Sequence, residues 1–191
     1  NDQARRVAAC IDRVEVVDLP VDEGNDMVRS IDLILDQLAD QSVVPYIIAE
    51  IPTNPRVEVP DLVQLKAVLS KKRKAKNGAD AVDPVFILDQ TFCPNVHFLG
   101  EGEILSTVKT IAYVSGSKFP SGGKCTAGFC VANKKAEALM KKIESHLIPE
   151  YTFSSCAGAI CLKVSVFQDI FYEVVILLHF PFKFSKKSRA V

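Results

Sequence analysis

The chain has 191 residues, 48% of them hydrophobic, which is enough to bury the core of one ordinary domain and excludes a disordered chain. Its 23 basic residues balance its 23 acidic ones, so no net field draws it to nucleic acid or to an anionic membrane. No charged segment followed by an apolar one opens the sequence, and with six cysteines we expect a reduced, cytoplasmic protein.

The first predicted elements alternate between strand and helix. Residues 14–17 suit a short strand, and apolar residues at helical spacing then follow Gly24-Asn25-Asp26, a candidate N-cap. A nearly continuous apolar run over 43–50 predicts a strand covered on both faces. A helix from residue 60 to 78 begins with proline and ends in a basic run, which we interpret as a solvated helix end, with a nuclear-localisation signal as the alternative.

The second half continues the alternation. Three further strands are predicted over 85–89, 110–114 and 127–131, and a helix over 136–147. This order predicts an α/β fold, with a mostly parallel sheet and helices on both faces. Residues 151–191 break the pattern, and we treat them as a divergent apolar and basic C-terminal extension. Charges interrupt its apolar run, so a membrane-associated tail is only the alternative to a buried or irregular segment.

Two cysteine pairs share a spacing of five residues, and they are Cys125 with Cys130 and Cys156 with Cys161. Such pairs could ligate zinc if three or four of the thiols converged. Cys130 lies inside an apolar run, which favours a buried thiol over a ligand. We therefore predict no metal site.

Polar residues at three predicted strand ends carry the chemistry. Asn54 lies between two prolines after the 43–50 strand, Asp89 closes the next strand, and Lys118 follows Ser115-Gly116-Ser117 at the end of the third. Open α/β sheets bind ligands at the carboxyl ends of their strands. An amine that loses its proton in such a site can form a Schiff base with an aldehyde.

Together these segments resemble the large-domain core of the Cys/Met-metabolism family of pyridoxal-phosphate enzymes, the cystathionine synthases and lyases of fold type I. The resemblance spans residues 14–148 and is carried by Pro52-Thr53-Asn54-Pro55, Asp89-Gln90-Thr91-Phe92 and Ser115-Gly116-Ser117-Lys118-Phe119, with several glycines after them. It implies that residues 1–150 are part of an aminotransferase-like large domain that binds pyridoxal 5'-phosphate.

The resemblance also implies roles for individual residues. Lys118 would be the catalytic residue that carries the internal aldimine, and Asp89 would pair with the pyridinium nitrogen and keep the ring an electron sink. The other implied cofactor-binding residues are Ser115 and Ser117 at the phosphate, Asn54 near the phenolic oxygen or the substrate carboxylate, and Thr91. The implied reaction cleaves or forms carbon–sulfur bonds of cystathionine, homocysteine or an activated homoserine, as a lyase or transferase.

The chain also departs from the family pattern. It shows no glycine-rich phosphate turn upstream, no stacking aromatic ring and no arginine for the substrate carboxylate, so we expect the isolated chain to be incomplete. We expect a homo-oligomer with an amino-acid substrate, and neither nucleic acid nor a membrane as partner. The alternatives are a non-catalytic α/β scaffold and an interaction subunit that completes its site with another chain. A dinucleotide fold is disfavoured because no Gly-x-Gly-x-x-Gly run is present.

Overall fold

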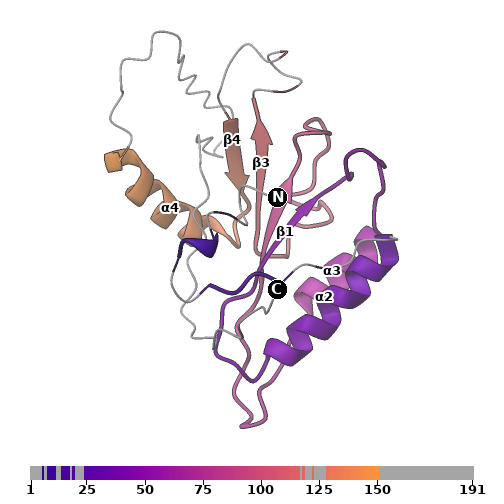
Figure 1. Ribbon diagram of the computed structural model, residues 1–191, viewed down its shortest axis with the longest axis vertical. Helices are drawn as coiled ribbons and strands as arrows, with labels where there is room; N and C mark the ends of the chain where they lie inside the picture. The colour runs from indigo at the N-terminus through magenta and orange to yellow at the C-terminus, as the bar shows by residue number, and fades with distance from the viewer. Residues whose placement is uncertain are drawn as a thin grey trace, which may run out of the picture.

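A four-stranded sheet forms the centre of the molecule (Figure 1). The computed structural model describes residues 6, 8–11, 14–17, 19, 24–116, 118, 122 and 128–150. The strands are β1 (Tyr46–Glu50), β2 (Val85–Asp89), β3 (Thr110–Ser115) and β4 (Gly128–Ala132), adjacent in that order. The first three strands run parallel and β4 is antiparallel to β3, which confirms an α/β fold with a mostly parallel sheet.

Two helices cover one face of the sheet. They are α2 (Gly24–Leu38) and α3 (Leu62–Ser70), which lie side by side in Figure 1. Their buried faces join those of β1 and β2 in one apolar cluster, whose members include Ile31, Leu35, Leu65, Phe86 and Leu88. The helical spacing predicted for these segments is therefore confirmed. None of the helices in the described part of the chain combines the length and apolar character that crossing a membrane requires.

The start of α3 agrees with its sequence signal. The carboxylate of Asp61 accepts hydrogen bonds from the backbone N–H groups of Val63 (2.9 Å) and Gln64 (3.0 Å). These bonds satisfy two of the amide groups that have no partner inside the first helical turn. Asp61 is therefore the N-cap that fixes where α3 begins.

The opposite face carries α4 (Glu137–Glu150), which packs on β3 and β4. Ile111, Cys130, Ala136 and Met140 form the buried cluster between them. Burial raises the pKa of the Cys130 thiol to about 12, so this cysteine is the buried thiol that its sequence context predicts. Its spacing partner Cys125 lies outside the described residues, as does the second cysteine pair. No cluster of three histidine, cysteine or acidic residues in the described segments could hold a metal ion.

Two sequence predictions about strands are wrong. Residues 14–17 form no strand, and Val16 and Val17 are 45% and 55% exposed, so no apolar contact favours pairing there. The 43–50 run contributes only the five residues of β1, which begins after Pro45 and is half-buried as an edge of the described sheet. The fourth strand, whose direction the sequence left open, runs antiparallel to β3.

The structure also corrects the interpretation of the basic run after α3 as a solvated helix end. The helix ends at Ser70, eight residues before the predicted end, and the run that follows, residues 71–76 (the basic loop), is ion-paired. The pairs are Lys71 and Arg73 with Asp32 and Asp36, Lys72 with Asp83, Lys74 with Asp80, and Lys76 with Asp40. Asp32 and Asp36 lie four residues apart on α2 and therefore share one helix face, and Asp40 follows shortly after the end of that helix. The basic loop is thus fastened to α2.

Candidate functional site

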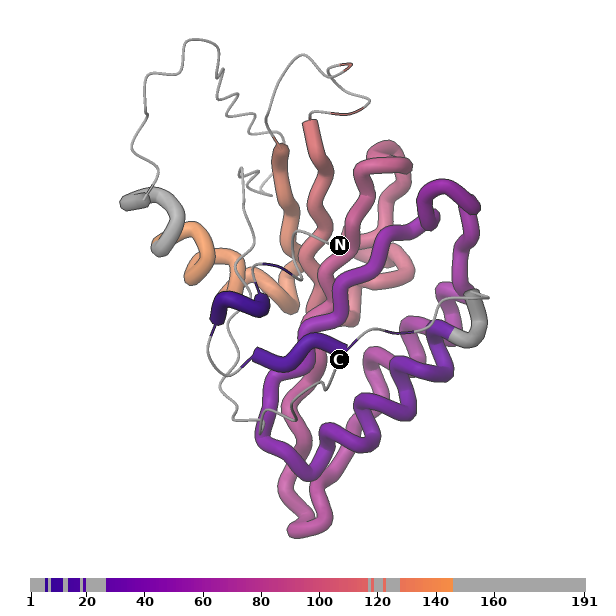
Figure 2. Tube along the Cα trace, in the orientation of Figure 1, coloured from indigo at the N-terminus to yellow at the C-terminus, as the bar shows by residue number. Residues whose placement is uncertain are grey.

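The residues that close β1, β2 and β3 lie side by side at one end of the sheet. The strands are parallel, so the segments that follow them all leave at this end (Figure 2). In the strand register, Glu50 is paired with Asp89, and Asp89 with Tyr113. Register partners in a sheet point to the same face. Glu50, Asp89 and Tyr113 therefore form a row on the face that α4 also occupies, and Cys130 of β4 continues that row.

Asp89 is held by the chain that follows it. Its Oδ1 accepts the backbone N–H of Thr91 at 2.9 Å, and the Thr91 hydroxyl oxygen accepts the backbone N–H of Ser115, also at 2.9 Å. These two bonds join the carboxyl end of β2 to that of β3. Three of the residues predicted for the site, Asp89, Thr91 and Ser115, are thus brought together.

Tyr113 belongs to this site, although the sequence analysis did not include it. Burial, the charge of Asp89, a hydrogen bond to Asp89 and the charge of Glu50 raise the pKa of Tyr113, in that order of size. The hydroxyl therefore remains protonated at neutral pH, and because Tyr113 is the register partner of Asp89, its O–H is available as a donor to that carboxylate. A sequence signal existed, because Tyr113 lies two residues before Ser115 and alternation along a strand places both on one face.

Asn54 lies in a closed loop after β1. The Thr53 N–H donates to the Glu58 carbonyl (3.0 Å), and the Glu58 N–H donates to the Thr53 hydroxyl oxygen (3.0 Å). Within this loop, the Asn54 N–H donates to Glu50 Oε2 at 3.3 Å, and the Asn54 side chain is exposed. Val57 in the same loop has a φ of 59°, a left-handed conformation that is unusual for a β-branched residue. The loop places Asn54 at the edge of the site, one strand away from Asp89.

Lys118 follows β3 by three residues. It is exposed, and its carbonyl accepts the Gly122 N–H at 2.9 Å in a turn. Its ammonium forms no ion pair with any residue that the structure describes. Ser117 lies outside the described residues. The structure therefore places Lys118 at the same end of the sheet as Asp89, without direct contact between the two side chains.

The row of Glu50, Asp89 and Tyr113 contains two carboxylates and no cationic side chain. Within the described part of the chain, neither Glu50 nor Asp89 forms an ion pair, although both are only partly exposed and lie on neighbouring strands. Two adjacent carboxylates of this kind favour a cationic partner. A protonated ring nitrogen or an ammonium group would meet this requirement, so the acceptor set fits the pyridinium nitrogen of pyridoxal phosphate.

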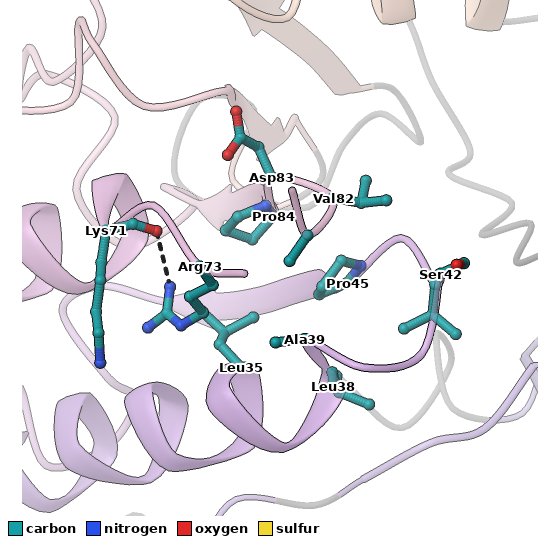
Figure 3. A pocket seen from close by; sticks show the side chains of 12 residues that line it. Leu35, Leu38, Ala39, Ser42, Pro45, Lys71, Arg73, Val82, Asp83 and Pro84 are labelled. Carbon is teal, nitrogen blue, oxygen red and sulfur yellow. Dashed lines mark hydrogen bonds between the residues drawn. The ribbon is translucent and has the colours of Figure 1, made fainter. Parts of the chain in front are cut away.

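A small pocket lies at the other end of the strands (Figure 3). Its lining includes Leu35, Pro45, Arg73 and Pro84, and the Arg73 guanidinium crosses it to donate to the carbonyl of Lys71 at 3.2 Å. Its volume of about 10 Å³ has room for one water molecule at most. The pocket lies between the end of α2 and the basic loop, and it is too small to be a ligand site.

No protein-family model, curated protein or solved structure matches the chain. The family resemblance therefore depends on the three motif segments themselves and on where the fold places them.

Proposed function

We propose that the chain is a pyridoxal-phosphate-dependent enzyme of the transsulfuration type, or part of one, with Lys118 as the residue that binds the cofactor covalently. One observation carries the proposal. Asp89 and the segment that leads to Lys118 occupy the carboxyl ends of two adjacent parallel strands, and Thr91 joins these ends by hydrogen bonds. Ligands of open α/β sheets bind at this position.

Each residue at this edge has a task that its chemistry supports. The Asp89 carboxylate would keep a proton on the ring nitrogen of the cofactor, because a negative partner favours the charged form of that nitrogen. Ser115 and Ser117 would donate to the phosphate, and Asn54 and Thr91 would contact the ring or the substrate carboxylate. When bound, the cofactor withdraws electrons from the α-carbon of an amino acid. The Lys118 amine would take the proton that this carbon loses.

The proposed substrates are amino acids with sulfur or an activated oxygen in the side chain, such as cystathionine, homocysteine or an activated homoserine. Loss or replacement of that substituent would be the net reaction, as in lyases and transferases. The finer parts of the proposal are membership of the fold type I family, a cytoplasmic location and assembly with copies of the same chain. They derive from the sequence resemblance and its cysteine usage.

Covalent trapping tests the proposal. The full chain is incubated with pyridoxal phosphate, reduced with borohydride and mapped by mass spectrometry. We expect the label on Lys118, no label at this site in Lys118→Ala, and an unchanged label in Lys109→Ala. Lys109 is a suitable control because it directly precedes β3 and lies at the opposite end of that strand. A label confined to other lysines, or no label, would contradict the proposal and favour a scaffold or an interaction subunit.

A further inference from the structure

We propose that Tyr113 is the positioning residue of Asp89, which it holds in one orientation at the edge of the sheet through a hydrogen bond from its hydroxyl. This inference deepens the proposed function and depends on it for its consequence on cofactor binding. The contact between the two side chains can be tested without any cofactor. None of the sequence motifs points to this role, since Tyr113 lies inside an apolar strand.

The ring of Tyr113 is anchored from two sides. It packs against the buried pair Val85 and Ile87 of β2 and against the buried cluster that includes Cys130 of β4 and Met140 of α4. Its backbone carbonyl accepts the N–H of Gln90 at 2.9 Å, directly beside Asp89. Because backbone and ring are both fixed, the hydroxyl has little freedom to leave the carboxylate.

The carboxylate needs such a second donor. The Thr91 N–H binds only Oδ1 of Asp89, so this bond alone lets the carboxylate turn about it. Glu50, its register partner on the other side, carries the same charge and repels it. A donor from β3 offsets this repulsion and turns the carboxylate away from Glu50.

The surroundings of the hydroxyl support a donor role. The charged groups that face it are Glu50 and Asp89, and both are acceptors. On the β4 side its register partner is Cys130, whose thiol remains neutral because of burial, and α4 contributes the apolar Leu139. The hydroxyl therefore faces two carboxylate acceptors. Asp89, on the neighbouring strand, is the one that the proposed function requires.

The first experiment uses the chain without cofactor. NMR of isotope-labelled tyrosine follows the titration of each ring, with Tyr46 as the internal control. Tyr46 lies on the same face, four residues before Glu50 and at the far end of β1, and burial alone raises its pKa. We expect Asp89→Asn to lower the pKa of Tyr113, because tyrosinate then forms without a negative neighbour, and to leave Tyr46 unchanged. An unchanged Tyr113 titration would overturn the inference.

The second experiment measures pyridoxal phosphate affinity by absorbance. Tyr113→Phe removes only the hydroxyl, and Tyr46→Phe makes the same change away from the site. We expect Tyr113→Phe to raise the Kd about tenfold, since a hydrogen bond to a charged group is lost. Tyr46→Phe should bind like the unaltered chain. Equal affinity of the Tyr113→Phe and unaltered chains would contradict the inference.

The two experiments separate the inference from the function that it extends. If the unaltered chain binds no pyridoxal phosphate, the proposed function is wrong, and the tyrosine titration alone decides whether Tyr113 and Asp89 interact. If the cofactor binds and only Tyr113→Phe weakens it, both are supported. Circular dichroism of each variant confirms that the fold is retained.

Discussion

Asn133 shows how a single buried side chain joins several segments, at the end of the sheet opposite the candidate site. It is 6% exposed and follows β4 directly. Its amide nitrogen donates to the carbonyls of Leu105 (2.9 Å) and Val108, and its oxygen accepts the N–H of Ala136 at 3.2 Å. The side chain thereby ties the segment before β3 to the turn that begins α4.

Replacement of Asn133 should therefore destabilise the protein strongly. We expect Asn133→Ala to lower the free energy of unfolding by about 3 kcal/mol, because it leaves buried carbonyl and N–H groups without partners. Urea unfolding at neutral pH measures this change. Asn77→Ala is the matched control, since Asn77 is exposed and accepts one hydrogen bond from Ala79. Equal effects of the two substitutions would show that the Asn133 network contributes little.

At the scale of single residues, the sequence predicted some members of the site and missed others. Asp89 was predictable because it ends a run of four apolar residues, and a carboxylate rarely closes a buried strand without a reason. Tyr113 was missed because a tyrosine inside an apolar strand looks like a core residue. Its role depends on the register between β2 and β3, which the sequence does not contain.

Among the elements, the basic loop makes the densest set of ion pairs. Arg73 is its centre, with only 7% of its side chain exposed and bonds to both Asp32 and Asp36. Removing one member of a buried ion pair costs about 3–5 kcal/mol. The two aspartates are 34% and 47% exposed, so water compensates for part of the loss. We expect Arg73→Met to cost about 1–2 kcal/mol in urea unfolding at neutral pH.

A matched variant and a pH series test this expectation. Lys72→Met removes a cation from the same loop, but its pair with Asp83 is exposed on both sides, so the cost should be below about 0.5 kcal/mol. Hydrogen bonds from Lys71 and then Arg73 lower the pKa of Asp36. That contribution is complete above the unfolded pKa of about 3.9 and is lost as the pH falls toward the folded value.

The cost of Arg73→Met should therefore shrink on acidification. At about pH 2.5 the aspartates are largely protonated in the unfolded chain, and the cation has less charge to bind. The difference between the Arg73→Met and unaltered chains should then be clearly smaller than at neutral pH. A difference that is constant with pH would mean that Arg73 acts through packing of its stem.

Element types were more predictable than element surroundings. The periodicity of α2, the Asp61 cap of α3 and the apolar run of β2 are local signals, and the structure confirms them. The strand predicted over 14–17 failed because its side chains have no surface to cover. The end of α3 was missed because Asp32 and Asp36, which bind Lys71 and Arg73, lie on α2, more than thirty residues earlier.

For the molecule as a whole, the sheet gives the candidate site a rigid base. Helices α2 and α3 cover one face and α4 the other, and the strand ends with Glu50, Asp89 and Tyr113 meet at one edge (Figure 1). By the family resemblance, no phosphate turn and no carboxylate-binding arginine are recognised in the sequence. Each missing charge-assisted contact costs about 1.5–3 kcal/mol, so we expect the chain alone to bind pyridoxal phosphate only in about the millimolar range.

The most direct test of the central claim is an absorbance titration of the full chain with pyridoxal phosphate. We predict a visible band that grows to saturation, disappears in Lys118→Ala and persists in Lys109→Ala, because the band requires a covalent bond to Lys118. No visible band at any cofactor concentration, or an equal band in Lys118→Ala, would contradict the account.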